Sequence, residues 1–194
     1  MMDTSRANAR LPRPLPASAE KARLNCLRDL GILETGNDAA IDNLVESVAN
    51  FFRVPMTVFT LIDEDRQWFK SRYGLHGEGT ERADSFCQYT ICQTEVFRVP
   101  DTWVHPEFKS YPAVIDYPNI RYYAGVPVRV RDGHALGSLC IMDQKPNAVP
   151  VNKLTWLNHF AGILTQIIEL NYAAEDERII QRFAGTSVRA GMRR

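Results

Sequence analysis

Residues 120–143 read IRYYAGVPVRVRDGHALGSLCIMD, and this stretch gives the strongest indication of the fold. Two runs rich in apolar and β-branched residues, 120–130 and 135–143, flank the dipeptide Asp132-Gly133. Asp-Gly between two such runs is typical of a tight β-hairpin turn. The stretch therefore predicts two adjacent antiparallel strands.

A second hairpin is predicted earlier in the chain. MTVFTLID (56–63) and QWFKSRY (67–73) are rich in β-forming residues and are separated by a charged turn. TEVFRVP (94–100) has the composition of a third, shorter strand segment. These runs predict an antiparallel sheet. Trp68 and Phe69 are adjacent in this hairpin, so one is expected to face the core and the other solvent or a partner.

Helices are predicted before and after the strands. Ser18 is a candidate N-cap for a helix that runs to about Leu33, and Asn37 is a candidate N-cap for a second helix. Apolar residues at helical spacing carry the second helix to just before Pro55. The longest helix is expected from about Asn152 to Phe183.

Two further segments lie between the predicted hairpins. SFCQYTIC (85–92) is expected to form a short helix. Residues 101–119 show no regular periodicity but contain three prolines and several aromatic side chains. A loop of this length in a compact domain is usually a lid or a binding segment. The order of elements predicts an α+β fold, with helices on one face of the sheet and loops over a pocket on the other.

Composition restricts the class of protein. A chain of 194 residues with 45% hydrophobic and 24% charged residues is typical of one soluble globular domain with extensions. No apolar run has the length of a membrane span, and the first residues do not resemble a secretory signal. Four cysteines in such a chain indicate a reducing, cytoplasmic environment. Both ends are basic but lack interleaved aromatic residues, so no nucleic-acid partner is expected.

Six sequence blocks together resemble a bacterial GAF domain of the subgroup found ahead of diguanylate cyclases and sensor histidine kinases. The resemblance covers about residues 20–172. The blocks are LRDLGILET (27–35), VPMTVFTLIDEDRQWFKSRYGL (54–75), SFCQYTI (85–91), VPD (99–101), IRYYAGVPV (120–128) and DGHALGSLCIMD (132–143).

This resemblance implies a GAF-like six-stranded antiparallel sheet, a helical layer on one face and a loop-covered pocket on the other. It also implies a homodimer formed through the N- and C-terminal helices. The expected organisation is a loosely ordered arm at 1–17, a GAF domain at 18–172, and a signalling-helix extension with a basic tail at 173–194. The chain carries no recognisable catalytic domain, so it is either a free-standing sensor or a fragment of a longer protein.

The resemblance also implies which residues surround the ligand. Tyr123 is expected to point into the pocket, with Cys140 on the neighbouring strand and Asp101 as a polar edge. The full set of expected ligand-binding residues is Phe86, Cys87, Tyr89, Asp101, His105, Phe108, Tyr111, Tyr123, Gly125 and Cys140. Aromatic walls with a few polar groups suit a small, partly apolar molecule. The sequence leaves the cofactor unknown.

These residues do not favour a reductase. Free methionine-(R)-sulfoxide reductases share the GAF fold and place a redox cysteine at the position of Cys87. Their loop cysteines have no counterpart here, and Tyr123 and Cys140 stand where that family has carboxylates. Cys92 lies five positions from Cys87 on a short helix, which places the two thiols on neighbouring turns at poor angles for resolving a sulfenic acid, so neither cysteine is expected to do chemistry.

Metal, bilin and cyclic-nucleotide sites are also disfavoured. Cys87, Cys92 and His105 lack the paired spacing of a zinc site. The family's covalent bilin site has a histidine after its cysteine, where Gln88 follows Cys87 here. The polar signature of cyclic-nucleotide-binding members is not found.

The sequence therefore predicts a non-enzymatic, cytoplasmic sensory domain for signal transduction. It would bind a small molecule and signal through its terminal helices to an output partner, such as a diguanylate cyclase or a histidine kinase. The alternative is a dimerisation or protein-interaction scaffold with a vestigial pocket. An enzyme resembling the reductases is the third hypothesis.

Overall fold

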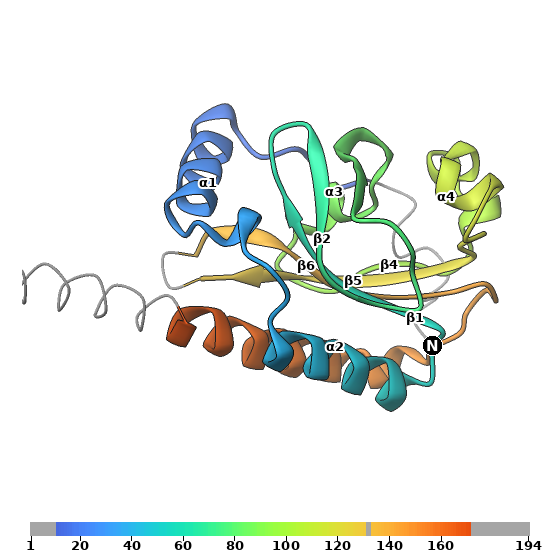
Figure 1. Ribbon diagram of the computed structural model, residues 1–194. Coiled ribbons are helices and arrows are strands. Elements are labelled where there is room, and N and C mark those ends of the chain that lie inside the picture. Colours follow the sequence, from blue (N-terminus) through green and yellow to red (C-terminus); the bar gives the residue numbers. More distant parts are fainter. Residues whose placement is uncertain (1–10, 131–132, 172–194) are drawn as a thin grey trace, which may run out of the picture.

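A computed structural model describes residues 11–130 and 133–171 of the chain. These residues form a six-stranded antiparallel sheet, which confirms the predicted α+β fold (Figure 1). The strand order across the sheet is β3-β2-β1-β6-β5-β4. The strands are β1 (Met56–Ile62), β2 (Arg66–Tyr73), β3 (Gly79–Glu81), β4 (Phe97–Val99), β5 (Tyr122–Arg129) and β6 (Ala135–Asp143).

Both predicted hairpins are present, and they meet at the centre of the sheet. β1 pairs with β2, β5 pairs with β6, and β1 also pairs with β6, all in antiparallel orientation. At the β5–β6 connection the Val130 N–H donates to the His134 carbonyl at 3.2 Å, and Gly133 adopts a φ of 79°. This left-handed conformation is the reason that a glycine suits the turn. Asp132 lies outside the described residues.

The edge strand β3 is not predicted by the hydrophobic pattern of the sequence. Its three residues are all exposed and carry no large apolar side chain, so they show no alternation. Gly79 permits its close approach to β2, because a Cβ there would lie 2.1 Å from the Gln67 carbonyl oxygen. The predicted strand at 94–100 is also shorter than expected, since only Phe97–Val99 pair with β5.

Two helices cover one face of the sheet. α2 (Ala39–Phe52) and the helix at residues 155–171, which follows a 3-10 turn at Val151–Lys153, run beneath the strands in Figure 1. α1 (Ala17–Asp29) instead packs where β1 ends and β6 begins. There the Arg23 guanidinium donates to the Ile62 carbonyl at 2.6 Å and to the Ala135 carbonyl at 3.4 Å.

The predicted ends of the first helix are wrong. α1 begins directly after Pro16, and the structure shows no side-chain cap, so Ser18 lies inside the helix rather than at its N-cap. The helix ends at Asp29 rather than Leu33, because Gly31 adopts a left-handed φ of 60°. A short 3-10 turn, Ile32–Glu34, follows it.

The predicted starts of the other two long helices are also corrected. Asp38 caps α2 in place of Asn37, with its carboxylate accepting the N–H groups of Ala40 at 2.9 Å and Ile41 at 3.2 Å. The last helix begins at residue 155, three residues later than predicted. The predicted continuation to Phe183, the extension at 173–194 and most of the arm at 1–17 lie outside the described residues.

The sheet has an apolar core on each face. Tyr122 and Ala124 of β5 face α2 and the last helix, whereas Tyr123 of β5 and Cys140 of β6 face the loops on the other side. This confirms the strand alternation that the sequence predicts. Trp68 and Phe69 likewise separate, with Trp68 against the helical core and Phe69 against the loop-side core.

Residues 101–119 are more regular than expected. They contain two 3-10 turns, Thr102–Val104 and Phe108–Ser110, and the short helix α4 (Pro112–Ile115). Phe108 and Val114 of this segment are completely buried in the loop-side core. The segment therefore packs on the loop face of the sheet, together with the one-turn helix α3 (Cys87–Thr90).

Candidate functional site

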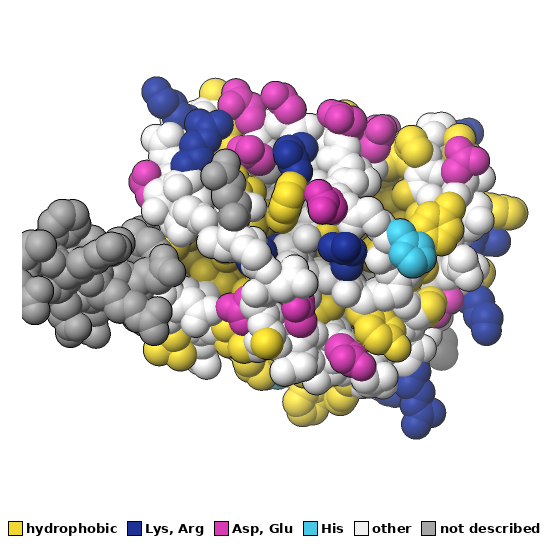
Figure 2. All heavy atoms as spheres, viewed as in Figure 1, with side chains coloured by type: hydrophobic (Ala, Val, Ile, Leu, Met, Phe, Trp, Pro, Cys, Tyr) yellow, Lys and Arg dark blue, Asp and Glu magenta, His cyan; other side chains and the backbone are white. Residues whose placement is uncertain are grey.

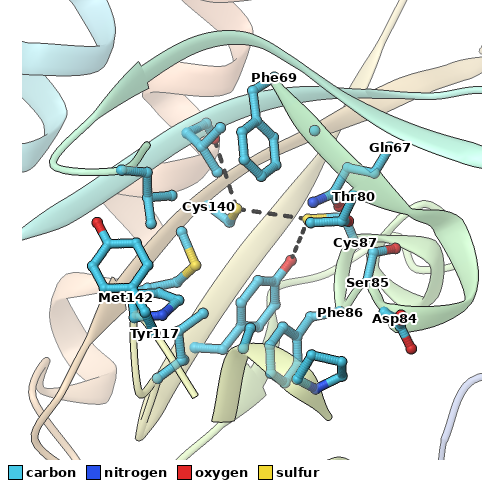
Figure 3. A pocket seen from close by; sticks show the side chains of 18 of the residues that line it. Gln67, Phe69, Thr80, Asp84, Ser85, Phe86, Cys87, Tyr117, Cys140 and Met142 are labelled. Atoms are coloured by element: carbon cyan, nitrogen blue, oxygen red, sulfur yellow. Dashed lines mark hydrogen bonds between the residues drawn. The ribbon is translucent and has the colours of Figure 1, made fainter. Parts of the chain in front are cut away.

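A cavity of about 190 Å³ lies on the loop face of the sheet, between the strands, the residues that lead into α3, and the segment around α4 (Figure 3). Most of the side chains around it are apolar. Exposed residues such as His76 and Tyr117 surround its outer part, and buried ones such as Cys140 surround its inner part. The lining residues are Val58, Gln67, Phe69, Leu75, His76, Gly79, Thr80, Asp84, Ser85, Phe86, Cys87, Pro112, Ala113, Tyr117, Pro118, Ile120, Tyr123, Cys140 and Met142.

Four of the ten predicted ligand-binding residues line this cavity: Phe86, Cys87, Tyr123 and Cys140. Tyr123 and Cys140 are brought there by neighbouring strands, and Phe86 and Cys87 by the chain that enters α3. The rings of Phe86 and Tyr123 stack with centroids 4.9 Å apart. All four side chains are buried, so together they form the inner wall.

Three predicted aromatic residues lie behind this wall rather than on it. Phe108 and Tyr111 pack on Phe86 with ring centroids at 4.8 and 5.6 Å. Tyr89 contacts the ring of Phe108, and its hydroxyl lies 3.3 Å from the Tyr111 hydroxyl. Burial, then the neighbouring Tyr89, raises the pKa of Tyr111. These three residues support the cavity but do not line it.

The remaining three predicted residues also lie away from the cavity. Asp101 forms an ion pair with Arg121 at 2.7 Å and accepts the Trp103 N–H at 3.1 Å. The hydrogen bond from Arg121 lowers the pKa of Asp101. His105 stacks on Phe108 with ring centroids 4.4 Å apart. Gly125 lies beneath the Tyr123 ring, because a Cβ there would be 2.4 Å from the Tyr123 hydroxyl oxygen.

Sequence reasoning missed several lining residues, of which Gln67 is the most informative. Its side chain is only 6% exposed, and its Oε1 atom has no hydrogen-bond partner among residues 11–130 and 133–171. In Figure 3 Gln67 faces the space that Cys87 and Cys140 also face. Alternation along β2 could have indicated its direction, since Gln67 pairs with Ile62 of β1, which also faces the loop-side core.

The charge around the cavity is low. Its lining includes neither lysine nor arginine, and Asp84 is its only carboxylate, among the residues that the structure covers. A phosphate-bearing ligand normally requires arginine or lysine, or a cluster of backbone N–H groups. The arrangement therefore suits a neutral molecule.

The inner wall contains a cluster of thiols and hydroxyls. The Cys87 and Cys140 sulfurs lie 3.7 Å apart, and the Tyr123 hydroxyl donates to the Cys87 sulfur at 3.4 Å. Thr90 Oγ1 is 2.6 Å from the Tyr123 hydroxyl oxygen. These side chains come from α3, β5 and β6, and all of them are buried.

The helical layer presents a second surface feature. Phe51 of α2 and Trp156 of the last helix are about half exposed, with ring centroids 5.6 Å apart. Ile163 and Leu170 extend this exposed apolar surface along the last helix. Hydrophobic side chains gather along the lower edge of the molecule in Figure 2, over this layer. In contrast, the exposed residues of α1 are mostly polar.

The described residues show neither a membrane-spanning helix nor a metal-binding cluster. Within residues 11–130 and 133–171, no helix has the length and apolar character needed to cross a bilayer. The same residues contain no group of three or more histidine, cysteine or acidic side chains placed to hold a metal ion.

Comparison with known proteins places this architecture among signalling proteins. The GAF domain family matches residues 37–170. A cyclic di-GMP phosphodiesterase of Pseudomonas aeruginosa is 36% identical over 146 residues, which cover 75% of this chain and 25% of that protein. The chain therefore corresponds to about a quarter of the length of this relative.

Solved structures share the fold at lower identity. The free methionine-R-sulfoxide reductase of Neisseria meningitidis, in complex with its substrate, has a TM-score of 0.59 and 18% identity, covering 86% of this chain and 99% of that chain. The GAF domain of an Acinetobacter phosphoenolpyruvate-protein phosphotransferase has a TM-score of 0.58 and 18% identity, covering 80% of this chain and 98% of that chain. At these identities the similarity concerns the fold alone.

Proposed function

The chain belongs to the GAF domain family, and from this premise we propose that it is a non-enzymatic sensory domain that binds a small, neutral, mainly apolar molecule in the cavity. Membership of this family indicates a sensory or regulatory role in signal transduction. The single observation that carries the ligand proposal is the unpaired Gln67 Oε1 at an apolar cavity.

An unpaired buried polar atom is costly, and this cost suggests a missing partner. Leaving a buried acceptor unsatisfied costs about 1–3 kcal/mol. A ligand with an N–H or O–H group directed at Gln67 would remove that penalty, while the aromatic and aliphatic wall would cover the rest of the molecule. The ligand is thus expected to be apolar with one hydrogen-bond donor.

The volume of the cavity limits the ligand further. An apolar protein cavity of about 150 Å³ accommodates benzene, and this cavity measures about 190 Å³. A single substituted ring or a small heterocycle fits this space. Of the predicted site residues, Phe86, Cys87, Tyr123 and Cys140 would contact it directly, and Phe108, Tyr111 and Tyr89 would hold Phe86 in place.

The last helix is the proposed route of the signal. It covers the helical face of the sheet through buried residues such as Leu157 and Leu164, and β5 and β6 connect that face to the cavity wall. The relative from Pseudomonas aeruginosa is a cyclic di-GMP phosphodiesterase, so an output enzyme of cyclic di-GMP signalling, or a histidine kinase, is the proposed partner. Cytoplasmic localisation follows from this role and is part of the proposal.

A homodimer is proposed through the helical layer. The exposed apolar residues Phe51, Trp156, Ile163 and Leu170 lie on α2 and the last helix, and contiguous exposed apolar surface commonly marks an interaction site. α1 exposes mainly polar residues, so we propose α2 in its place as the partner of the C-terminal helix. The same surface favours the second candidate function, an interaction scaffold whose cavity is vestigial.

Native mass spectrometry of the protein purified from its own host, beside a denatured aliquot, tests the proposal. A non-covalent small-molecule adduct is expected on the native protein and not on the denatured one. Gln67→Leu should lose this adduct and also unfold at higher urea concentration, because it removes the unpaired Oε1 atom. Gln88→Leu is the control, since its amide binds the Ala83 carbonyl at 2.9 Å and does not line the cavity.

The outcomes separate the two candidate functions. An adduct retained by Gln67→Leu would place the ligand elsewhere. A native dimer without any adduct would contradict the sensor function. If Gln67→Leu also binds its partner as the wild type does, the scaffold function would be supported.

A further inference from the structure

The two buried cysteines of the cavity wall are in direct contact through their sulfur atoms. Cys87 and Cys140 are separated by 53 positions in the sequence, yet their sulfurs are 3.7 Å apart. A disulfide has an S–S distance of about 2.0 Å. The two sulfurs are therefore already neighbours, with no other side chain between them.

We propose that Cys87 and Cys140 form a redox-active dithiol, which a small peroxide entering the cavity oxidises to an intramolecular disulfide. This inference does not depend on the proposed ligand, because it needs only the two thiols and access to them. Their partners in the structure, the position of the cavity and the placement of the other cysteines support it.

The surroundings of Cys87 favour its thiolate. The Tyr123 hydroxyl donates to its sulfur, and Thr90 lies within hydrogen-bond distance of that hydroxyl. Burial alone raises the pKa of Cys87, but hydrogen bonds from Cys140, Ser138, Tyr123 and Thr60 outweigh burial and lower this pKa. Burial and the neighbouring Cys87 raise the pKa of Cys140. Since the thiolate is the nucleophile, Cys87 is the attacking group and Cys140 the resolving one.

The cavity provides the access that buried thiols need. Both cysteines line it, as do exposed residues at its outer part, including Thr80 and His76. Figure 3 shows Cys87 and Cys140 facing the same space. A molecule of the size of hydrogen peroxide can therefore reach the sulfurs through this cavity of about 190 Å³.

The chemistry balances without a further reactant. The Cys87 thiolate attacks one oxygen of hydrogen peroxide, the O–O bond breaks, and the leaving hydroxide takes a proton to become water. The Cys140 sulfur then attacks the sulfur of the Cys87 sulfenic acid and forms the S–S bond. The hydroxyl of the sulfenic acid leaves and takes the Cys140 proton, which gives a second water. Two thiols and one peroxide thus give one disulfide and two waters. Two molecules of a low-molecular-weight thiol return the pair to the dithiol by thiol–disulfide exchange and leave as their own disulfide.

The remaining cysteines provide internal controls. Cys92 lies five residues from Cys87, but its thiol donates to the Gln88 carbonyl at 3.3 Å, and it does not line the cavity. Cys26 is on α1, and it does not line the cavity either. Oxidation at the cavity should leave both of these thiols free.

In the experiment the reduced full chain is treated with a small molar excess of hydrogen peroxide. It is then denatured and alkylated with N-ethylmaleimide, and its mass is measured by mass spectrometry. The number of alkylated thiols is expected to fall from four to two. Peptide mapping should identify one Cys87–Cys140 cross-link, and dithiothreitol should restore four reactive thiols. Cys92→Ser should form the same cross-link, whereas Cys140→Ser should stop at a sulfenic acid that dimedone traps.

Peptide mapping of the peroxide-treated wild-type protein tests the proposal even if a cysteine variant does not fold. Four alkylatable thiols after treatment, or a cross-link that involves Cys92 or Cys26 instead, would overturn the proposal. Oxidation of Cys87 to the sulfinic acid without a cross-link would also overturn it, because it would show that Cys140 does not resolve the intermediate.

Discussion

Arg23→Met tests how α1 is attached to the sheet. The Arg23 side chain is buried and donates to the Ile62 carbonyl at 2.6 Å, and its guanidinium pairs with Glu20 at 2.7 Å. Arg82, on the chain that leads into the cavity wall, binds the same Glu20 oxygen at 2.7 Å. Methionine keeps most of the aliphatic packing of arginine but removes every donor.

The expected cost follows from these contacts. Removing one partner of a buried ion pair costs about 3–5 kcal/mol when the other charge is left alone. Glu20 would not be left alone, because it is 20% exposed and keeps Arg82. The Ile62 carbonyl loses a charged donor, which costs about 1–3 kcal/mol. We therefore expect the free energy of unfolding to fall by about 2–3 kcal/mol at pH 7.

The pH dependence supplies an independent check. Burial raises the pKa of Glu20, but hydrogen bonds from Arg23 and Arg82 dominate and lower it from 4.5 to about 2. A carboxyl with a depressed pKa in the folded state contributes stability above its unfolded pKa and loses it as the pH falls toward the folded value. After allowance for solvent screening of this partly exposed group, the contribution is about 1–2 kcal/mol. The difference between wild type and Arg23→Met should therefore shrink as the pH falls from 5 to 3.

Urea unfolding followed by circular dichroism at several pH values measures both quantities. Arg28→Met is the matched control on the same helix, because Arg28 is 52% exposed and its ion pair with Glu64 lies at the surface. Its expected loss is below about 0.5 kcal/mol. A loss for Arg23→Met no larger than this control, or one that does not change between pH 5 and 3, would refute the reasoning.

Three further predictions concern stability and are checked by the same urea unfolding. Gly125→Ala should cost about 1–3 kcal/mol, because its Cβ would lie 2.4 Å from the Tyr123 hydroxyl oxygen, whereas Gly162→Ala, in the last helix with nothing within 4 Å, should stabilise by about 0.5–1 kcal/mol. A lower free energy of unfolding for Gly162→Ala would contradict the placement of Gly162 inside a helix. Asp38→Ala should cost about 1 kcal/mol and Asn37→Ala only a few tenths; the reverse order would restore the cap predicted from sequence. The peroxide-oxidised protein should gain up to about 4 kcal/mol over the reduced form, since its disulfide would close a loop spanning 53 positions, and no gain would indicate a strained bond.

Several features of this protein were predictable because they depend on neighbouring residues. The alternation in β5 places Tyr122 and Tyr123 on opposite faces of the sheet. Gly133, which the sequence marks as a turn residue, adopts a left-handed φ. Helical periodicity predicted the position of α2 to within a few residues. It could not distinguish Asn37 from Asp38 as the N-cap. Capping depends on which side chain meets the free N–H groups, and both residue types can do so. β3 escaped prediction because an exposed edge strand of three residues has no hydrophobic pattern.

The sequence by itself determined the α+β fold, the two faces of the sheet and the aromatic character of the loop side, since periodicity and turn chemistry are local properties. Only the tertiary structure decided which aromatic residues line the cavity and which, like Phe108, fill the space behind it. It also placed the unpaired Gln67 Oε1 atom at the cavity and brought Cys140 beside Cys87. These relations depend on long-range strand pairing and packing between residues far apart in the chain, which no local pattern encodes.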